Sequence, residues 1–530
     1  MGETDTVDVD QKYVNATVNL ALDTLKIEKQ ALVFVNSKRS AEKTAEDIAQ
    51  KIKTVDPELQ TLAEQVVGAI AKPTKQCERL GRCVAKGTAF HHSGLTQKQR
   101  QLIEDSFRSG KVKIIACTPT LAAGVDLPAY RAIIRDLKRY SETGWGGMQY
   151  IPVLEYLQMA GRAGRPSYDS VGEAICIVSS EAEKEAVHEK YTRGEPEEIY
   201  SKLAVEPVLR TYILSLIATE FVHTKSEILD FFSRTFWAFQ FKDMQHLRDI
   251  IERMLDLLER YEFIIMKPKD DFVSADEIRG EDEKIRATFL GRRVAQLYID
   301  PLTAHHLIKR IRRSTEKMIH EFGLLQMVTN TLEMRPLLRV KTKEFDTIME
   351  QFNSYDHYVF QKEPSIYEPE YDEFLASVKT AFFLLNWIEE KDEEYLLQQF
   401  DVRPGETRVK IERADWLLYC CEELAKIMHF NEIVKQVIKL RFRLKYGVKE
   451  ELLPLLRLRG IGRVRARKMF TNGIKDIGDV KKTDVASLAQ LLGKALAIDV
   501  KKQVGQEVEV PDAISDRRRK GQMSLGKYQD

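Results

Sequence analysis

Two arginines three residues apart form the most chemically suggestive pair in the sequence. Arg162 and Arg165 lie in the segment Gln158–Pro166, which reads QMAGRAGRP. At this spacing the side chains project side by side from a helix end, and the Ala and Gly residues between them let a neighbouring domain approach closely. Paired guanidinium groups suit a polyphosphate, because their forked donors stabilise charge that develops on a γ-phosphoryl group. A surface salt bridge is the alternative interpretation.

His91 and His92 are the residues that most invite a metal-binding interpretation. Neighbouring residues on an extended strand point to opposite faces, so these two imidazoles are not expected to share an ion. None of the six cysteines shows CxxC spacing. We therefore predict no metal site and a reduced, cytosolic interior.

Basic residues gather in one stretch of an otherwise balanced chain. The whole sequence has 82 Lys and Arg against 81 Asp and Glu, a net charge of +1. Between Lys435 and Lys468, however, twelve basic residues face only two acidic ones. Such a segment is typical of a surface for a polyanion, with a solvated helix face as the alternative.

The first part of the chain alternates apolar strands with amphipathic helices. Continuous β-branched runs predict strands covered on both faces, at Ala31–Asn36, Lys113–Cys117, Arg131–Arg135 and Ala174–Val178. Helices are expected between them, at Ser40–Ile52, Thr96–Ser109 and Val153–Ala160. This pattern predicts a doubly wound α/β domain over residues 1–192.

The rest of the chain is predicted to be almost entirely helical. Two amphipathic helices and a short extended piece, Phe263–Lys267, indicate a winged helix over 193–290. Helices broken by prolines favour a bundle over 291–448. A compact helical DNA-binding unit follows over 449–505, and a flexible polar tail over 506–530.

Four segments resemble motifs of superfamily-2 helicases, in the order that the family has them. Gln158–Pro166 resembles motif VI (QxxGRxxR), Cys117–Pro128 motif V, Ala89–Leu95 motif IVa and Phe34–Ser37 motif IV. Each stands at a strand end, where α/β sheets bind ligands. The sequences of these motifs are most similar to those of the archaeal fork-processing Ski2-like DNA repair helicases, which are relatives of the polymerase theta helicase. The resemblance covers essentially the whole chain. The resemblance implies a RecA-like domain followed by winged helix, helical ratchet bundle and helix-hairpin-helix domains.

The resemblance also implies roles for the matched residues. Arg162 and Arg165 would be arginine fingers, with Gln158 on the nucleotide phosphates. Gly124 and Asp126 would lie at the nucleotide edge of motif V, where relatives often have Asn in place of Asp126. The DNA backbone would be contacted by Asn36, Ser37, Ser93, Thr118 and Thr120. Small hydroxyl groups fit that task, because backbone contacts permit translocation without reading sequence.

Residues 135–152 predict a β-hairpin with a Gly-rich turn. In the resembled family this hairpin parts the strands at the duplex junction. An apolar tip can replace the stacking that is lost when a base pair opens. The candidate strand-separating residues are Tyr140, Trp145, Met148 and Tyr150. An ordinary surface hairpin is the alternative.

A helix predicted over Thr407–Ile427 carries Arg408, Arg413 and Trp416. An aromatic ring flanked by cations can stack a base and hold phosphates, and the segment resembles the family's ratchet helix. Val409 stands where relatives are often basic, and a core tryptophan is the alternative role for Trp416.

The segment Leu458–Lys468 is similar to a helix-hairpin-helix element. Gly460 and Gly462 permit a tight turn whose amides can face a phosphate. Arg463, Arg465 and Arg467 follow on one helix and are predicted to bind the DNA backbone.

Two motifs that a helicase motor requires are missing from residues 1–530. The sequence contains neither GxxxxGK[ST] nor DExH, the elements that hold ATP and Mg²⁺. The first RecA-like domain has no counterpart before Tyr13, so it would have to be supplied in cis or in trans. We predict that the chain alone neither binds ATP tightly nor hydrolyses it.

These observations predict the C-terminal part of an ATP-dependent 3′–5′ DNA helicase that acts on single-stranded and forked DNA in replication-coupled repair. The alternatives are a non-enzymatic DNA-binding module and an RNA helicase of the Ski2-like class. A degenerate sliding-clamp motif, Gln522–Tyr528, raises a clamp as a further partner. No signal peptide and no 18-residue apolar stretch occur, so a cytoplasmic, nucleoid-associated location without membrane contact is expected.

Overall fold

A computed structural model describes residues 7–53, 56–70, 72–141, 147–164, 169, 171–203, 205–267 and 284–506. The chain divides into two compact units. One comprises Met1–Ser201 and Asp392–Lys410, and the other comprises Lys202–Lys391 and Ile411–Asp530. Each unit is described by itself below.

A five-stranded parallel sheet forms the centre of the first unit. Its strands are β1 (Ala31–Phe34), β2 (Thr88–His91), β3 (Ile114–Cys117), β4 (Arg131–Ile134) and β7 (Glu173–Cys176), in the order β2-β3-β1-β4-β7. Residues of β1 to β4 are buried throughout, as expected for a sheet covered on both faces. The four strands predicted from apolar runs are confirmed, each slightly shorter than predicted.

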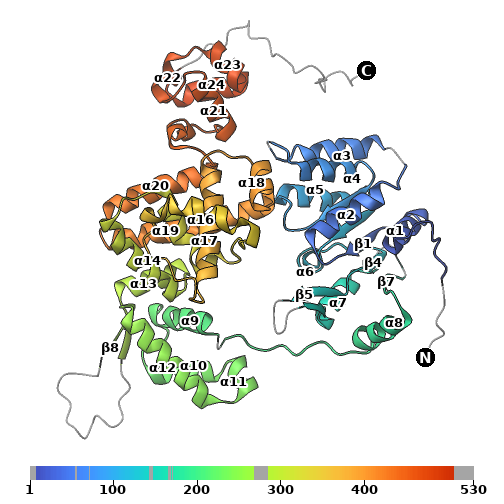
Figure 1. Ribbon diagram of the computed structural model, residues 1–530, viewed down its shortest axis with the longest axis horizontal. Coiled ribbons are helices and arrows are strands. Elements are labelled where there is room, and N and C mark those ends of the chain that lie inside the picture. Colours follow the sequence, from blue (N-terminus) through green and yellow to red (C-terminus); the bar gives the residue numbers. More distant parts are fainter. Residues whose placement is uncertain are drawn as a thin grey trace. The chain divides into compact units, whose positions relative to one another are not determined.

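Helices cover both faces of this sheet (Figure 1), with α2 on one side of the strands and α7 on the other. The helices of the α/β fold are α1 (Ala16–Lys26), α2 (Lys38–Ala49), α3 (Pro57–Val67), α4 (Lys75–Val84), α5 (Gln97–Arg108), α6 (Thr120–Gly124), α7 (Val153–Ala160) and α8 (Glu181–Val187). Ser37 caps α2, and Thr96 caps α5 in a capping box.

The segment between β4 and α7 forms the predicted hairpin. Strands β5 (Lys138–Ser141) and β6 (Gly147–Tyr150) pair antiparallel, with Tyr140 opposite Met148. The tip between them, with Trp145, lies outside the described residues.

A distant piece of the sequence completes the first unit. Helix α18 (Glu393–Phe400) and the beginning of α19 (Pro404–Ile427) cluster with the α/β fold up to Lys410, whereas the rest of α19 belongs to the second unit. All of these residues were predicted from the sequence to lie in the helical bundle. Pro404 occupies the first turn of α19, where its missing N–H costs nothing, so the helix begins three residues before the predicted Thr407.

The second unit begins with a winged-helix arrangement. Helices α9 (Glu206–Ala218), α10 (Lys225–Ser233), α11 (Phe236–Phe241) and α12 (Met244–Arg260) precede an antiparallel wing of β8 (Ile264–Lys267) and β9 (Lys284–Ala287). Helix α9 packs against both α12 and β9.

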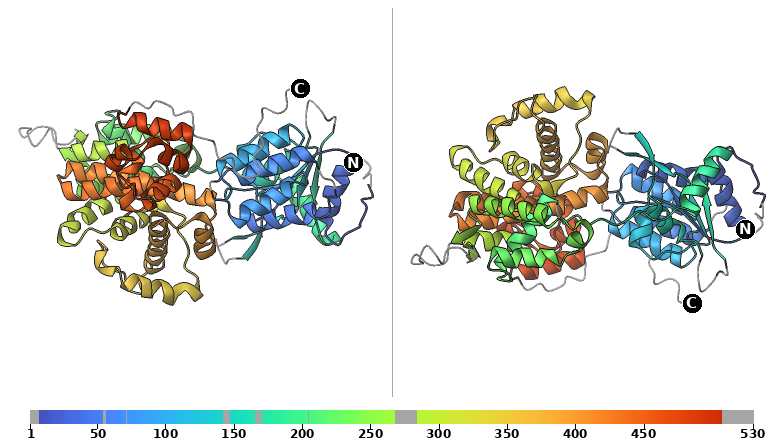
Figure 2. Two further views of the ribbon diagram at one scale, coloured as in Figure 1. Left: turned by 90° about the horizontal axis from the view of Figure 1, so that it is seen from above. Right: turned by 90° about the horizontal axis from the view of Figure 1, so that it is seen from below.

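A helical bundle follows, drawn in yellow to orange in Figure 2. Its helices are α13 (Phe289–Leu297), α14 (Pro301–Arg313), α15 (Glu321–Thr329), α16 (Phe345–Asn353), α17 (Tyr371–Ile388), the later part of α19, and α20 (Asn431–Tyr446). Helix α17 packs against α15 and α20.

Four short helices, α21 (Arg463–Thr471), α22 (Ile477–Lys482), α23 (Val485–Leu492) and α24 (Lys494–Gln503), end the described chain. They surround a core of their own, which includes Leu458, Ala466, Met469 and Leu488. Gly460 has a φ of +81°, which favours glycine at this turn. No helix within the described ranges is both long enough and apolar enough to cross a membrane. The predicted fold class, an α/β parallel sheet followed by helical domains, is confirmed.

Candidate nucleotide and nucleic-acid interface

Arg162 lies at the carboxyl edge of the sheet and is held by the segment that resembles motif V. Its guanidinium group donates from Nε to the Ala122 carbonyl oxygen at 3.1 Å and also from Nη2 to the same atom. Its Nη1 lies 3.4 Å from Asp126 Oδ1. The backbone of motif VI is tied to the end of motif V as well, because Ala129 donates to the Arg162 carbonyl and Gly164 donates to that of Ala129. The side chain is 22% exposed, so it is neither free nor sealed inside the protein.

The other predicted nucleotide residues surround Arg162 on an open surface. Gln158 and Gly124 are exposed, and a Cβ atom at Gly124 would have no neighbour within 4 Å. Asp126 has a side chain that is 95% exposed. Arg165, the second of the paired arginines, lies outside the described residues. The described residues predicted to bind nucleotide are therefore accessible to solvent.

The five residues predicted to contact the DNA backbone lie at the carboxyl edge of the sheet. Ser93 follows β2, Thr118 follows β3, and Asn36 and Ser37 follow β1, and these three strands are neighbours in the sheet. Thr120 lies two residues after Thr118, and their hydroxyl groups hydrogen bond at 2.9 Å. All five side chains are exposed or partly exposed. Parallel strands bring their carboxyl ends to one edge, which explains why residues far apart in sequence gather here.

Asn36 is also linked to the base of the hairpin. Its backbone N–H donates to Asp136 Oδ2 at 2.9 Å, and its side-chain Nδ2 donates to the Lys138 carbonyl at 3.3 Å. Asp136 is fixed in turn by the guanidinium group of Arg135. The carboxyl edge of the sheet and the base of the hairpin are thus joined by hydrogen bonds.

Tyr140 and Met148 form an exposed apolar pair beside the hairpin tip, 66% and 60% exposed. Tyr150 has a different environment, because it lies at the base of the hairpin, where Lys138 Nζ is 4.5 Å from its ring centroid. It also contacts the Tyr191 ring edge to face. Of the described candidates, Tyr140 and Met148 are therefore the most exposed, whereas Tyr150 is packed against neighbouring side chains.

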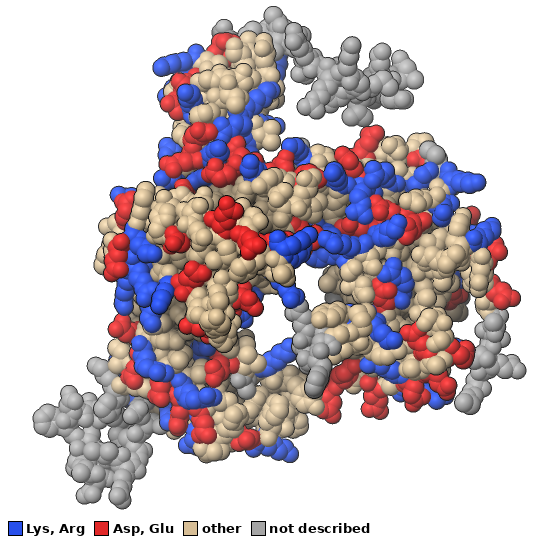
Figure 3. All heavy atoms as spheres, in the orientation of Figure 1, with Lys and Arg blue, Asp and Glu red and all other residues tan. Residues whose placement is uncertain are grey.

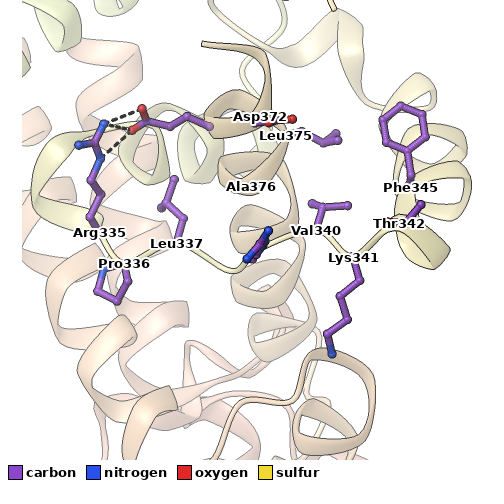
Figure 4. Close-up of a pocket in the computed structure, with 12 residues that line it drawn as sticks. Arg335, Pro336, Leu337, Val340, Lys341, Thr342, Phe345, Asp372, Leu375 and Ala376 are labelled. Atoms are coloured by element: carbon purple, nitrogen blue, oxygen red, sulfur yellow. Dashed lines mark hydrogen bonds and ion pairs between the residues drawn. The ribbon is translucent and has the colours of Figure 1, made fainter. Parts of the chain in front are cut away.

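Two of the predicted α19 residues are anchored to neighbouring segments. Trp416 is partly buried, and its Nε1 donates to the Leu297 carbonyl at 3.3 Å. Arg413 donates to the Arg335 carbonyl. Arg335 lines a cavity of about 880 Å³ with Leu337, Phe345 and Leu375. Figure 4 shows its side chain pointing toward a carboxylate, that of Glu373. Arg408 is exposed on the first turns of α19.

The three arginines of the helix-hairpin-helix segment do not share one environment. Arg467 makes a two-pronged ion pair with Glu390, at 2.6 and 2.8 Å, and a further pair with Glu451 at 2.7 Å. Arg463 lies 5.0 Å from the Trp387 ring centroid. Arg465 is exposed, and its Nη1 donates to the Gly460 carbonyl at 2.8 Å.

Acidic side chains accompany the basic ones on these helices. In Figure 3 the visible face of α21 to α24 carries both colours rather than a uniformly basic surface. The lopsided charge of residues 435–468 is therefore offset in space by acids from elsewhere, such as Glu389 and Glu390.

A buried charge cluster in the first unit went unnoticed in the sequence. Glu42 on α2 contacts Arg403 from the segment before α19 at 3.0 Å and lies 3.3 Å from His92 Nε2. Burial alone would raise the pKa of Glu42, but His92 and Arg403 outweigh it and lower that pKa to about 2. Burial lowers the pKa of His92. The sequence offered only an indirect signal of this cluster, because Gly94 and Gly405 permit the close approach of the two segments beside it.

The two histidines diverge as predicted. His91 Nε2 contacts Glu104 of α5 at 2.9 Å, whereas His92 faces Glu42 of α2. Within the described part of the chain, no group of three residues could hold a metal ion.

Three family models match the chain. They are the helicase conserved C-terminal domain over residues 13–167, a helix-turn-helix domain over 172–265, and the archaeal helicase domain 4 over 322–447. The first covers β1 to β4 and Arg162, and the last runs from α15 to the end of α20.

Curated relatives extend the similarity along nearly the whole chain. It is 40% identical to an ATP-dependent DNA helicase Hel308 of Pyrococcus abyssi, over 96% of this chain and 68% of that protein. It is 39% identical to the Hel308 of Pyrococcus horikoshii, over 94% of this chain and 67% of that protein. The Hel308 of Methanocella arvoryzae is 35% identical over 96% of this chain.

Proposed function

The chain belongs to the Hel308 family of archaeal Ski2-like ATP-dependent DNA helicases, and on this premise we propose that it supplies one wall of the ATP pocket and most of the DNA path. The observation that carries the proposal is the position of Arg162. Its guanidinium group lies at the sheet edge, fixed to Ala122 and beside the open surface at Gly124.

The other wall of the pocket would come from a first RecA-like domain. Residues 1–530 have neither a Walker A loop nor a DExH sequence, and the amides, lysine and carboxylate of those motifs hold ATP and Mg²⁺. Bound between the two domains, the nucleotide would supply the phosphoryl chemistry. This chain would contribute Arg162, Arg165 and Gln158, which orient the phosphates and stabilise their charge. Alone, the chain would have no ATPase activity.

The DNA would run along the carboxyl edge of the sheet toward α19. Asn36, Ser93 and Thr118 offer exposed amide and hydroxyl groups suited to a phosphate backbone. The Tyr140–Met148 pair would cap the last base pair of the duplex, so that bases separate there. Movement along the strand in the 3′-to-5′ direction and preference for forked DNA belong to the same proposal.

ATPase assays with and without a supplied first motor domain test the core of the proposal. The chain would be mixed with the first RecA-like domain of a Hel308 relative, and ATP hydrolysis would be measured with and without single-stranded DNA. We expect DNA-stimulated hydrolysis only in the mixture. Hydrolysis by the chain alone would contradict the proposal that a first RecA-like domain supplies the other wall of the ATP pocket. A mixture that binds DNA but never hydrolyses ATP would favour a non-enzymatic DNA-binding module.

The substrate proposal is tested separately with matched duplexes. Unwinding by the active mixture would be compared on 3′-tailed, 5′-tailed and forked DNA of one sequence, with RNA of that sequence as competitor. We expect forked and 3′-tailed DNA to be unwound and RNA to compete poorly. Equal competition by RNA would favour the RNA-helicase alternative.

A further inference from the structure

The buried cluster around Glu42 joins two parts of the first unit that are some 300 residues apart in the sequence. Glu42 is 5% exposed and Arg403 10% exposed in their side chains, and His92 is fully buried. The remaining oxygen of Glu42 pairs with Arg79 at 2.7 Å. A carboxylate so enclosed is stable only while its cationic partners stay in place. The cluster therefore fixes where the segment before α19 lies.

The backbone seals the same junction. Gly405 donates its N–H to the Gly94 carbonyl at 3.0 Å. A Cβ atom on Gly405 would overlap the carbonyl oxygens of Ser93 and Leu95, and one on Gly94 would overlap the side chain of Arg403. His92 supports the loop from inside, because its Nδ1 accepts the Gly94 N–H at 3.1 Å. Gly405 is needed because the two segments touch main chain to main chain, and Gly94 leaves room for the Arg403 side chain.

Two further ion pairs join the same segments and are less buried than the cluster. Lys38 pairs with Glu406, and Arg39 pairs with Asp401 at 2.6 Å. The Arg39–Asp401 pair is largely exposed, and exposed pairs contribute little to stability. It spans the same gap between α2 and the α19 segment without entering the buried cluster.

Two exposed side chains flank this junction on the solvent side. Ser93 precedes Gly94 and is exposed, and Arg408 is exposed one helical turn after Gly405. Residues three apart on a helix are neighbours on one face, so Arg408 lies on the face of α19 that Gly405 turns toward the loop. A hydroxyl and a guanidinium group on two adjoining backbone segments suit phosphates of one strand.

We propose that the Glu42–His92–Arg403 cluster is a joint that makes the start of α19 part of the motor domain, so that Ser93 and Arg408 form a single binding surface for a DNA backbone. Arg403 is then a positioning residue, which acts on DNA only through Arg408 and the helix behind it. The inference rests on the proposed function, because it requires the strand to run along this edge. A rigid surface binds more tightly than two separately mobile contacts, since no ordering cost is incurred on binding.

A double-mutant cycle between Arg403→Gln and Arg408→Ala tests the joint. The affinity of the full chain for a fluorescent oligo-dT would be measured by anisotropy in all four variants. With Arg408 present, we expect Arg403→Gln to weaken binding about tenfold, because the phosphate contact loses its position. In the Arg408→Ala background the same change should cost about threefold or less, since the contact to be positioned is already gone.

Further variants separate positioning from general damage. Arg39→Gln removes the exposed pair across the same gap and should leave affinity unchanged. Gly405→Ala forces the segments apart without altering any charge and should reproduce the pattern of Arg403→Gln, which covers the case in which Arg403→Gln does not fold. An equal loss in both Arg408 backgrounds, from either joint variant, would overturn the inference. A wild-type chain that binds no oligo-dT would instead overturn the proposed function.

Discussion

At the level of single residues, the guanidinium group of Arg162 is held mainly by a backbone carbonyl, with one side chain, Asp126, nearby. Two of its nitrogens donate to the Ala122 carbonyl, at the end of the segment that resembles motif V. A planar guanidinium group can direct two donors at this carbonyl and others at a ligand in a fixed plane, whereas the donors of an ammonium group all radiate from one nitrogen. The placement of the arginine therefore depends on α6, and a conservative change at Arg162 is not expected to be neutral.

Replacement of Arg162 by Lys should remove most ATPase activity. Hydrolysis by the mixture with a first motor domain should fall roughly 10³-fold, in the range found for arginine fingers. Affinity of the chain for single-stranded DNA, measured by anisotropy, should change by less than about twofold, because phosphate contacts to DNA lie elsewhere. An unchanged ATPase rate in this variant would show that Arg162 does not face the nucleotide.

Glu42 makes the stability of the first unit sensitive to acid. Its pKa is lowered from 4.5 to about 2 in the folded protein, so its contribution is complete above pH 4.5 and is lost as the pH falls toward 2. The contribution should be on the order of 2–3 kcal/mol. Burial also lowers the pKa of His92 in the folded protein, so the unfolded chain takes up a proton at His92 at a higher pH than the folded protein does. Acid therefore lowers the free energy of unfolding through both groups.

Comparison of the wild type with Glu42→Gln isolates the carboxylate. Amide hydrogen exchange of β1, which reports unfolding of the sheet, would be followed in urea between pH 6 and pH 3.5. The wild type should lose unfolding free energy more steeply below pH 4.5 than the variant. Parallel curves for the two proteins would contradict the lowered pKa of Glu42.

At the level of elements, local sequence signals were sufficient for the sheet and its caps. Apolar runs such as Ala31–Phe34 define buried strands, and Ser37 and Thr96 begin helices as polar N-caps should. Main-chain pairing of the predicted hairpin also follows from its sequence. These features depend on neighbours in the chain, so periodicity and capping are enough to find them.

Elements that depend on distant partners could not be found in this way. Residues 392–410 look like any amphipathic stretch, and only the fold brings Arg403 to Glu42. The same limit applies to Arg467, which pairs with Glu390 and Glu451 in space although the sequence places it in a basic run. The helix was predicted to begin at Thr407, whereas Pro404 begins α19 and Gly405 permits close packing.

The hairpin offers a test at this scale. Serine at both Tyr140 and Met148 removes the exposed apolar pair from β5 and β6. Fork unwinding should fall roughly tenfold, because each base stacked on a side chain contributes about 1–3 kcal/mol, while DNA-stimulated ATPase is retained. Tyr212→Ser, which removes a similarly exposed tyrosine on α9, is the matched control. Loss of ATPase together with unwinding would show that the hairpin supports the motor rather than strand separation.

For the molecule as a whole, a net charge of +1 gives little long-range attraction to DNA, so binding must depend on local contacts. The five residues predicted along the sheet edge are uncharged, and Arg467 is already paired. Arg408 and Arg465 are exposed, and we expect about three cations on the proposed path, these two among them, to displace counterions from a strand.

The affinity of the chain for oligo-dT should therefore depend only weakly on salt. With about three cationic phosphate contacts, the logarithm of the association constant should fall with a slope near −2 against the logarithm of salt concentration, about 20-fold between 50 and 200 mM. Anisotropy titrations across that range measure the slope, and Arg408→Ala should make it shallower by less than about one unit. A slope steeper than about −5 would mean that many lysines and arginines outside the proposed path hold the strand. Since hydroxyl and amide contacts release no counterions, a shallow slope together with firm binding is what a motor surface built from small polar groups should give.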